Sequence, residues 1–76
     1  MNMQVECSFY VKEDVAQALP RRPDLVQTCM AEAEQSMTAL AKQRGRHLSE
    51  PPRFTDARPN GLGFVELWFT AETEAG

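Results

Sequence analysis

The side chains with the strongest potential for nucleophilic or metal chemistry are two cysteines and one histidine, Cys7, Cys29 and His47. A cysteine nucleophile needs an imidazole within hydrogen-bonding reach of its sulfur, and zinc sites typically contain close pairs such as C-x-x-C. These three residues lie in three different segments, so local spacing supports neither chemistry. We expect no catalytic residue and no metal site here. Cys7 and Cys29 are expected to be buried free thiols, and a disulfide joining their segments is the alternative.

Paired carboxylates and closely spaced glycines do not suggest an active site either. Glu32 and Glu34 are two residues apart, and on a helix that spacing places them on different sides. The Gly61-x-Gly63 sequence reads as a turn, because a dinucleotide site needs G-x-G-x-x-G between a strand and a helix. Without a convergent cluster of titratable residues, the sequence predicts a protein that is not an enzyme and binds no cofactor.

The composition is that of a small globular domain. The chain has 76 residues, of which 42% are hydrophobic and 25% charged, close to globular averages. Residues 1–76 therefore form one domain. Because a core of this size is marginal by itself, we expect the protein to form a homo-oligomer or to bind a protein partner.

The sequence also predicts a location. Its first residues, MNMQVECSFYVKED, lack the basic start and apolar run of a secretory signal. No window approaches the roughly 20 apolar residues that span a bilayer. We therefore expect a cytoplasmic protein that does not enter membranes, with its thiols reduced.

Periodicity predicts the first two elements. Residues 3–12 alternate, which indicates a half-buried strand with an apolar face made by Val5, Cys7, Phe9 and Val11. Residues 13–19 are expected to form one or two helical turns. The prolines of residues 20–23 stop a helix that continues, because proline lacks an amide donor.

The clearest helix is predicted over residues 24–45. Asp24 is the expected N-cap, and Lys42 and Arg44 in the last turn complement the helix dipole. Gly45 is a natural stop. The apolar stripe of this helix repeats at four–three spacing through Val26, Met30, Ala33, Met37 and Leu40.

The remaining residues predict a hairpin. Residues 46–52 are expected to be a loop, residues 53–58 an edge strand, residues 59–61 a turn and residues 63–71 a second clear strand. Residues 72–76 are expected to be a frayed tail. The predicted fold class is α+β: a small single-layer sheet in the order strand–helix–strand–strand, with one long helix on one face.

The last strand points to a candidate binding surface. If its uniformly apolar face, with Val65 and Leu67, lies against the helix, then Phe64 and Trp68 share the opposite face with Tyr10. Exposed aromatic side chains gathered on one face are typical of interaction sites. We therefore predict a protein interface at Tyr10, Phe64 and Trp68. The alternative is that a bulge or twist turns Phe64 or Trp68 into the core.

The charge distribution suggests a second class of function, nucleic-acid binding. The net charge is −3, but residues 42–58 hold five basic and two acidic residues, a local charge of +3. The candidate phosphate contacts in this stretch are Arg44, Arg46, Arg53 and Arg58. The aromatic face itself would carry Glu6 and Glu66, whose carboxylates repel phosphate. We therefore rank nucleic-acid binding second.

One tract is distinctive in its composition. The sequence PPRFTDARPNGLGFVELWFTAE, residues 51–72, follows a helix rich in Ala, Arg and Gln. In this it resembles small uncharacterised proteins of actinobacterial bacteriophages and their high-GC hosts. The resemblance implies a minor virion component or a host-directed protein, and no functional residue is carried over from it. The element order and a late-strand Trp are also similar to dodecins, small flavin-binding oligomers.

Overall fold

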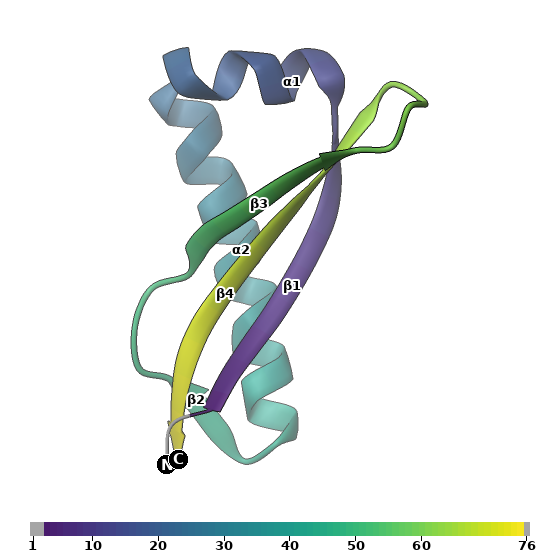
Figure 1. Ribbon diagram of the computed structural model, residues 1–76. Helices are drawn as coiled ribbons and strands as arrows, with labels where there is room; N and C mark the ends of the chain where they lie inside the picture. The colour runs from purple at the N-terminus through teal and green to yellow at the C-terminus, as the bar shows by residue number, and fades with distance from the viewer. Residues whose placement is uncertain (1–2, 76) are drawn as a thin grey trace.

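A computed structural model describes residues 3–75 of the chain. It begins with strand β1 (Met3–Lys12), helix α1 (Glu13–Ala18) and the 3-10 turn η1 (Leu19–Arg21), followed by the long helix α2 (Pro23–Gln43). Strands β2 (Arg46–Leu48), β3 (Arg53–Pro59) and β4 (Phe64–Ala75) complete the chain. Figure 1 shows the strands as one twisted layer with α2 behind it. This arrangement confirms the predicted α+β fold.

Strand β4 is the centre of the sheet. On one side it pairs antiparallel with β1 through ten consecutive residue pairs, from Met3↔Thr73 to Lys12↔Phe64. On the other side it pairs antiparallel first with β3 and then with β2. The hairpin of β3 and β4 was predicted, but the sheet has four strands because residues 46–48 pair with the end of β4. The expectation that residues 46–52 form only a loop was therefore wrong.

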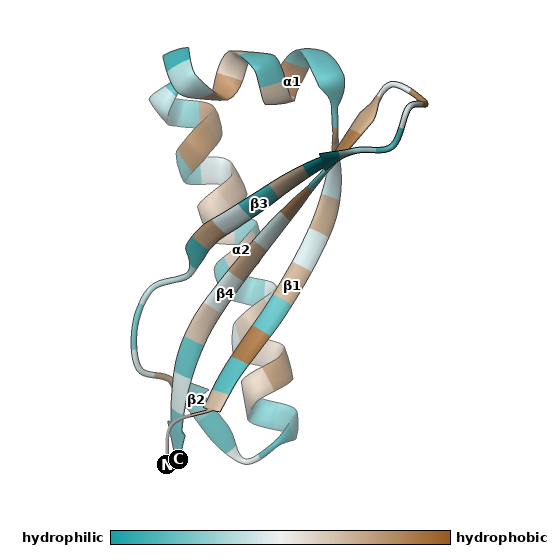
Figure 2. Ribbon diagram, viewed as in Figure 1, coloured by the Kyte–Doolittle hydropathy of each residue, from teal (hydrophilic) through white to brown (hydrophobic). Residues whose placement is uncertain are grey.

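The core lies between α2 and the inner face of the sheet, the face that α2 covers. The predicted alternation of β4 is confirmed, because Val65, Leu67 and Phe69 are buried. Figure 2 shows the same alternation of hydrophilic and hydrophobic residues along β1. On the helix, Ala33, Met37 and Ala41 are completely buried. Small alanine side chains let the helix backbone approach the sheet closely, and the flexible Met37 fills the remaining space. Val26 departs from the predicted stripe, since it is 40% exposed.

Local residues set both ends of α2, and its N-terminal end differs from the prediction. Asp24 is not the N-cap, because Pro23 takes the first helical position, which suits a residue without an amide donor. The Asp24 carboxylate instead accepts two hydrogen bonds from the Arg22 guanidinium, at 3.0 and 2.8 Å. Gly45, with φ +69°, ends the helix region in the left-handed conformation that glycine adopts without strain, as predicted.

The frayed tail predicted for residues 72–76 was also wrong for residues 72–75, and Gly76 lies outside the described residues. These residues continue β4 between β1 and β2. Thr73 is completely buried, donates to the Met3 carbonyl at 2.9 Å and accepts from Arg46 Nε at 2.8 Å. The acidic composition suggested a solvated tail, but Glu72 and Thr73 pair with β1, and Thr73, Glu74 and Ala75 pair with β2.

Replacing Thr73 with valine tests this end of the strand. The T73V variant keeps the shape but removes the hydroxyl that donates to the Met3 carbonyl and accepts from Arg46 Nε, while the bond from Arg46 Nη2 to the backbone carbonyl of residue 73 remains. The lost buried hydroxyl contacts cost about 1–3 kcal/mol of unfolding free energy. Urea denaturation measures the loss. Thr38→Val on the exposed side of α2 is the matched control and should change stability by less than about 0.5 kcal/mol. Equal effects of the two variants would mean that the end of β4 does not contribute to the fold.

Candidate functional site

The outer face of the sheet, opposite α2, carries the three aromatic residues predicted from the sequence. Tyr10 is 58% exposed, Phe64 is 42% exposed and Trp68 is partly buried. Tyr10 pairs across the strands with Glu66, two residues from both Phe64 and Trp68 on the same face of β4. The three side chains thus share one face and form what we call the aromatic patch: Tyr10, Phe64 and Trp68. The alternative, in which a bulge turns an aromatic residue inward, does not occur at Phe64 or Trp68.

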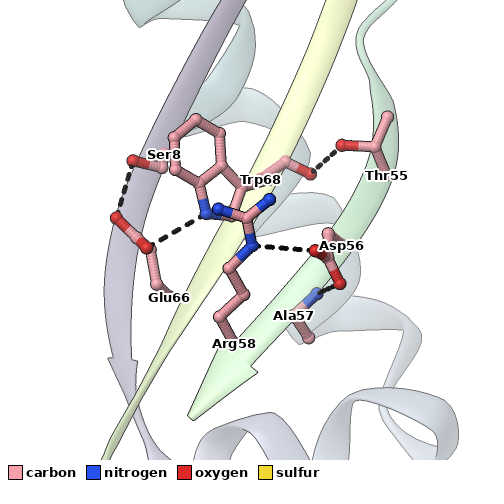
Figure 3. A network of polar contacts seen from close by, with 7 residues as sticks. All are labelled: Ser8, Thr55, Asp56, Ala57, Arg58, Glu66 and Trp68. Carbon is pink, nitrogen blue, oxygen red and sulfur yellow. Dashed lines mark hydrogen bonds and ion pairs between the residues drawn. The ribbon is translucent and has the colours of Figure 1, made fainter. Parts of the chain in front are cut away.

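A network of polar contacts holds Trp68 in place (Figure 3). The indole Nε1 donates to Glu66 at 3.0 Å, and Glu66 also accepts from the Ser8 hydroxyl at 3.1 Å. The Arg58 guanidinium lies over the indole ring, 4.7 Å from its centroid, in a cation–π arrangement. The ring is therefore positioned from β1, β3 and β4 at once.

Asp56 in turn orients Arg58. Its carboxylate accepts from Arg58 Nε at 2.8 Å with one oxygen and from the Ala57 amide at 2.9 Å with the other. The hydrogen bond from Arg58, followed by that from the Ala57 amide, lowers the pKa of Asp56. Since Asp56 is then ionised throughout the neutral range, the stacked position of Arg58 does not change with pH there.

Acidic and basic side chains are equal in number immediately around the aromatic patch, where Glu6, Asp56 and Glu66 lie near Lys12, Arg53 and Arg58. Farther along β4, Glu72 and Glu74 lie on the same face, so the outer face as a whole is acidic. Tyrosine, tryptophan and arginine are the residues most enriched at protein interfaces and among their energetic hot spots. The face therefore has the chemistry of a protein-binding surface and no excess of positive charge for phosphate.

The arginines predicted as phosphate contacts are not gathered into one basic surface. Arg46 binds Thr73, Arg53 lies 3.4 Å from Glu50, and Arg58 is held by Asp56. Arg44 is the C-cap of α2, two residues before Arg46, whereas Arg53 and Arg58 lie on β3. Three of the four thus already have acceptors within the chain, and two of these acceptors are carboxylates.

The residues considered for catalysis lie apart in the fold. Cys29 is buried against the core, Cys7 is half-buried on β1, and both are free thiols. His47 is exposed on β2 and its Nε2 lies 2.9 Å from Glu74. Within residues 3–75, no three His, Cys, Asp or Glu side chains lie close enough together to hold a metal ion. The structure therefore brings neither cysteine into a pair with the histidine.

The sequence did not predict an apolar cleft of about 320 Å³ on the inner side of the sheet. Helix α2 packs against β1, β4 and β2, while every residue of β3 is exposed, so part of the inner face next to β3 lacks a cover. Side chains from α1, η1, α2, β3 and β4 line the cleft, among them Ala16, Leu19, Val26, Met30, Phe54 and Phe69. The signal in the sequence was Phe54, an aromatic residue within an otherwise polar strand.

Comparison with known proteins gives no relative for this chain. No protein-family model matches it, and neither the curated proteins nor the solved structures searched give a match. Among residues 3–75, no helix is long and apolar enough to cross a membrane. The candidate site consequently rests on its own geometry and chemistry.

The two thiols give a test of this placement. Burial raises the pKa of Cys7, and burial followed by the charge of Glu32 raises the pKa of Cys29. Less thiolate is present near pH 8 than in an unfolded chain, so alkylation by iodoacetamide should be slower in the folded protein and recover in urea. Because the pKa of each thiol is raised in the folded protein, its contribution to stability is fully present below the ordinary cysteine pKa. That contribution is lost as the pH rises through the raised pKa. Mass spectrometry of both peptides measures the rates, and equal rates in folded and unfolded protein would contradict the placement.

Proposed function

We propose that this chain is a non-enzymatic self-assembling protein whose outer sheet face binds a second copy of itself. The observation that carries the proposal is the aromatic patch, in which Tyr10 and Phe64 remain exposed beside a Trp68 fixed by Arg58. A rigid aromatic side chain binds with little loss of conformational entropy, because it is ordered before the partner arrives. Among residues 3–75, neither Tyr10 nor Phe64 takes part in an aromatic pair or a cation–π contact.

The expected strength of this contact follows from its area. Aromatic side chains bury about 150–250 Å² each, so the exposed parts of Tyr10 and Phe64 amount to about 200 Å² per copy. At about 25 cal/mol/Å², a symmetric pair gains roughly 10 kcal/mol before costs. Association costs about 4–15 kcal/mol, which offsets much or all of this gain, so these two aromatic side chains alone give at most a modest affinity.

The total surface also favours association. The chain exposes 5182 Å², whereas a monomer of 8.6 kDa is expected to expose about 4700 Å². The excess of about 500 Å² is more than half of the roughly 800 Å² that each partner buries in a standard interface. A second copy would cover surface that the single domain leaves to solvent.

Local charge and the chemistry of the β3 edge both favour contact through the outer face, whereas the second sheet edge, on β1, pairs with no other strand among residues 3–75. Immediately around the aromatic patch, acidic and basic side chains are equal in number, so this part of the face can meet its own copy without net repulsion. Pairing through the β3 edge is less suited, because Pro59 has no amide donor and the Ala57 amide is bound by Asp56. A bulge between Phe54 and Asp56 disturbs that edge further.

Nucleic-acid binding is the weaker candidate, since Arg53 and Arg58 are paired with carboxylates and Glu6 and Glu66 lie on the aromatic face. A self-assembling domain agrees with the resemblance to small phage proteins. It would serve there as a minor virion component or as a host-directed effector in the host cytoplasm.

A double variant, Tyr10→Lys with Phe64→Glu, tests the proposal. Tyr10 pairs with Glu66 and Phe64 pairs with Lys12, so both substitutions create opposite-charge pairs that support the strands while removing the aromatic surface. Light scattering after size-exclusion chromatography should show a defined oligomer for the wild type and at least a tenfold weaker association for the variant.

The matched control is Gln35→Lys with Thr38→Glu on the exposed side of α2, which makes the same charge changes away from the sheet. It should associate like the wild type, and circular dichroism should show that both variants are folded. A wild type that stays monomeric, or a double variant that associates normally, would refute assembly through the outer face.

A further inference from the structure

Leu62 is the most exposed large hydrophobic side chain of the described residues, at 79%. It lies in the turn between β3 and β4, which Figure 1 shows projecting beyond the body of the sheet and away from α2. Turns are usually polar, and Leu62 makes no contribution to the core cluster of its own chain. We call this turn, residues 60–63, the leucine knob.

The leucine knob is held in one conformation. The Asn60 side-chain oxygen accepts from the amides of Leu62 at 2.7 Å and Phe64 at 3.2 Å, and the Asn60 amide donates to the Phe64 carbonyl at 3.0 Å. The Glu13 amide fastens the turn to α1 by donating to the Gly63 carbonyl at 2.9 Å. An exposed leucine on a preorganised turn loses little further freedom when it is buried.

The apolar cleft beside β3 is large enough and apolar enough to receive the leucine knob. Its volume of about 320 Å³ is about twice the roughly 150 Å³ of an apolar cavity known to hold a benzene ring, so it has room for a leucine side chain and part of its turn. Its walls include Val26 and Phe54, which are 40% and 55% exposed. An apolar side chain is the occupant that these walls favour, because they offer few polar groups to a polar ligand.

One pair of opposite charges supports this fit. Lys12, Glu13 and Asp14 adjoin the knob and carry a net charge of −1. Among the charged residues next in sequence to cleft residues, Arg53, Asp56, Arg58 and Glu66 lie on the outer face, which leaves Arg21, the neighbour of Pro20. The acidic Glu13 and Asp14 beside the knob are opposite in charge to Arg21 beside the cleft.

We propose that the leucine knob of one copy inserts into the apolar cleft of a second copy. This contact lies on other residues than the aromatic patch and uses two different surfaces, so it is heterologous. Together with a symmetric contact through the outer face, it would join dimers into a larger assembly. The knob contact does not depend on the aromatic patch, so either contact can form when the other is absent.

The native Cys29 lies in the cleft wall and makes the contact directly testable. In the Leu62→Cys variant, insertion places the new thiol beside Cys29 of another copy, so mild oxidation should give a disulfide-linked dimer on a non-reducing gel. Peptide mapping should find position 62 joined to Cys29. The bond should be lost when Cys29→Ser is added and retained when Cys7→Ser is added.

Complementation separates this contact from assembly through the outer face. Leu62→Glu removes the knob, Val26→Glu blocks the cleft, and both are combined with Tyr10→Lys and Phe64→Glu so that the aromatic patch is absent. Each protein alone should be monomeric, whereas their mixture should form a dimer through the one intact knob and the one intact cleft. Circular dichroism verifies folding of each variant. Linkage of position 62 only to itself, absence of linkage, or a mixture that stays monomeric would overturn the proposal.

Discussion

The pairing of β1 with β4 is the interaction on which the rest of the structure depends. Ten consecutive residue pairs join the two strands, and this register places one set of side chains against α2 and the other set on the outer face. A shift by one residue would exchange the two faces. If β1 slipped in this way, its apolar Val5 and Phe9 would face away from α2, and Tyr10 would lose its position beside Glu66. The core and the aromatic patch are therefore two results of a single register.

A single helix cannot cover a four-stranded sheet, and the candidate surfaces follow from this limit. Helix α2 brings its small residues, Ala33 and Ala41, close to the sheet and packs over β1, β4 and β2. Close packing there leaves β3 outside the cover, so Phe54 contacts Phe69 edge-on while more than half of its surface stays exposed. The apolar cleft is the space that remains between β3 and the first half of the helix. Within residues 3–75, no further helix or strand covers this space.

Sequence periodicity predicted most of the fold, because period-two and helical patterns report directly on burial. It gave the faces of β1 and β4, the long helix and the hairpin correctly. It failed where a tertiary partner decides the local structure. The acidic end of β4 is a strand because Glu72 and Thr73 pair with β1 and residues 73–75 pair with β2. Asp24 is not the N-cap because Pro23 takes the first position of the helix. The aromatic patch followed from alternation, whereas the apolar cleft depends on the lateral position of α2, which no pattern in the chain specifies.

The separation of β1 and β4 along the chain also governs when the protein can fold. Their pairs link residues as far apart as Met3 and Thr73, so closing the sheet orders almost the whole chain at once. During translation, the first strand and the long helix leave the ribosome before their central partner exists. Tyr10 is made early and Phe64 and Trp68 late, so the outer face is assembled only after β4 has emerged. The order of synthesis thus delays formation of the outer face until the domain is able to fold.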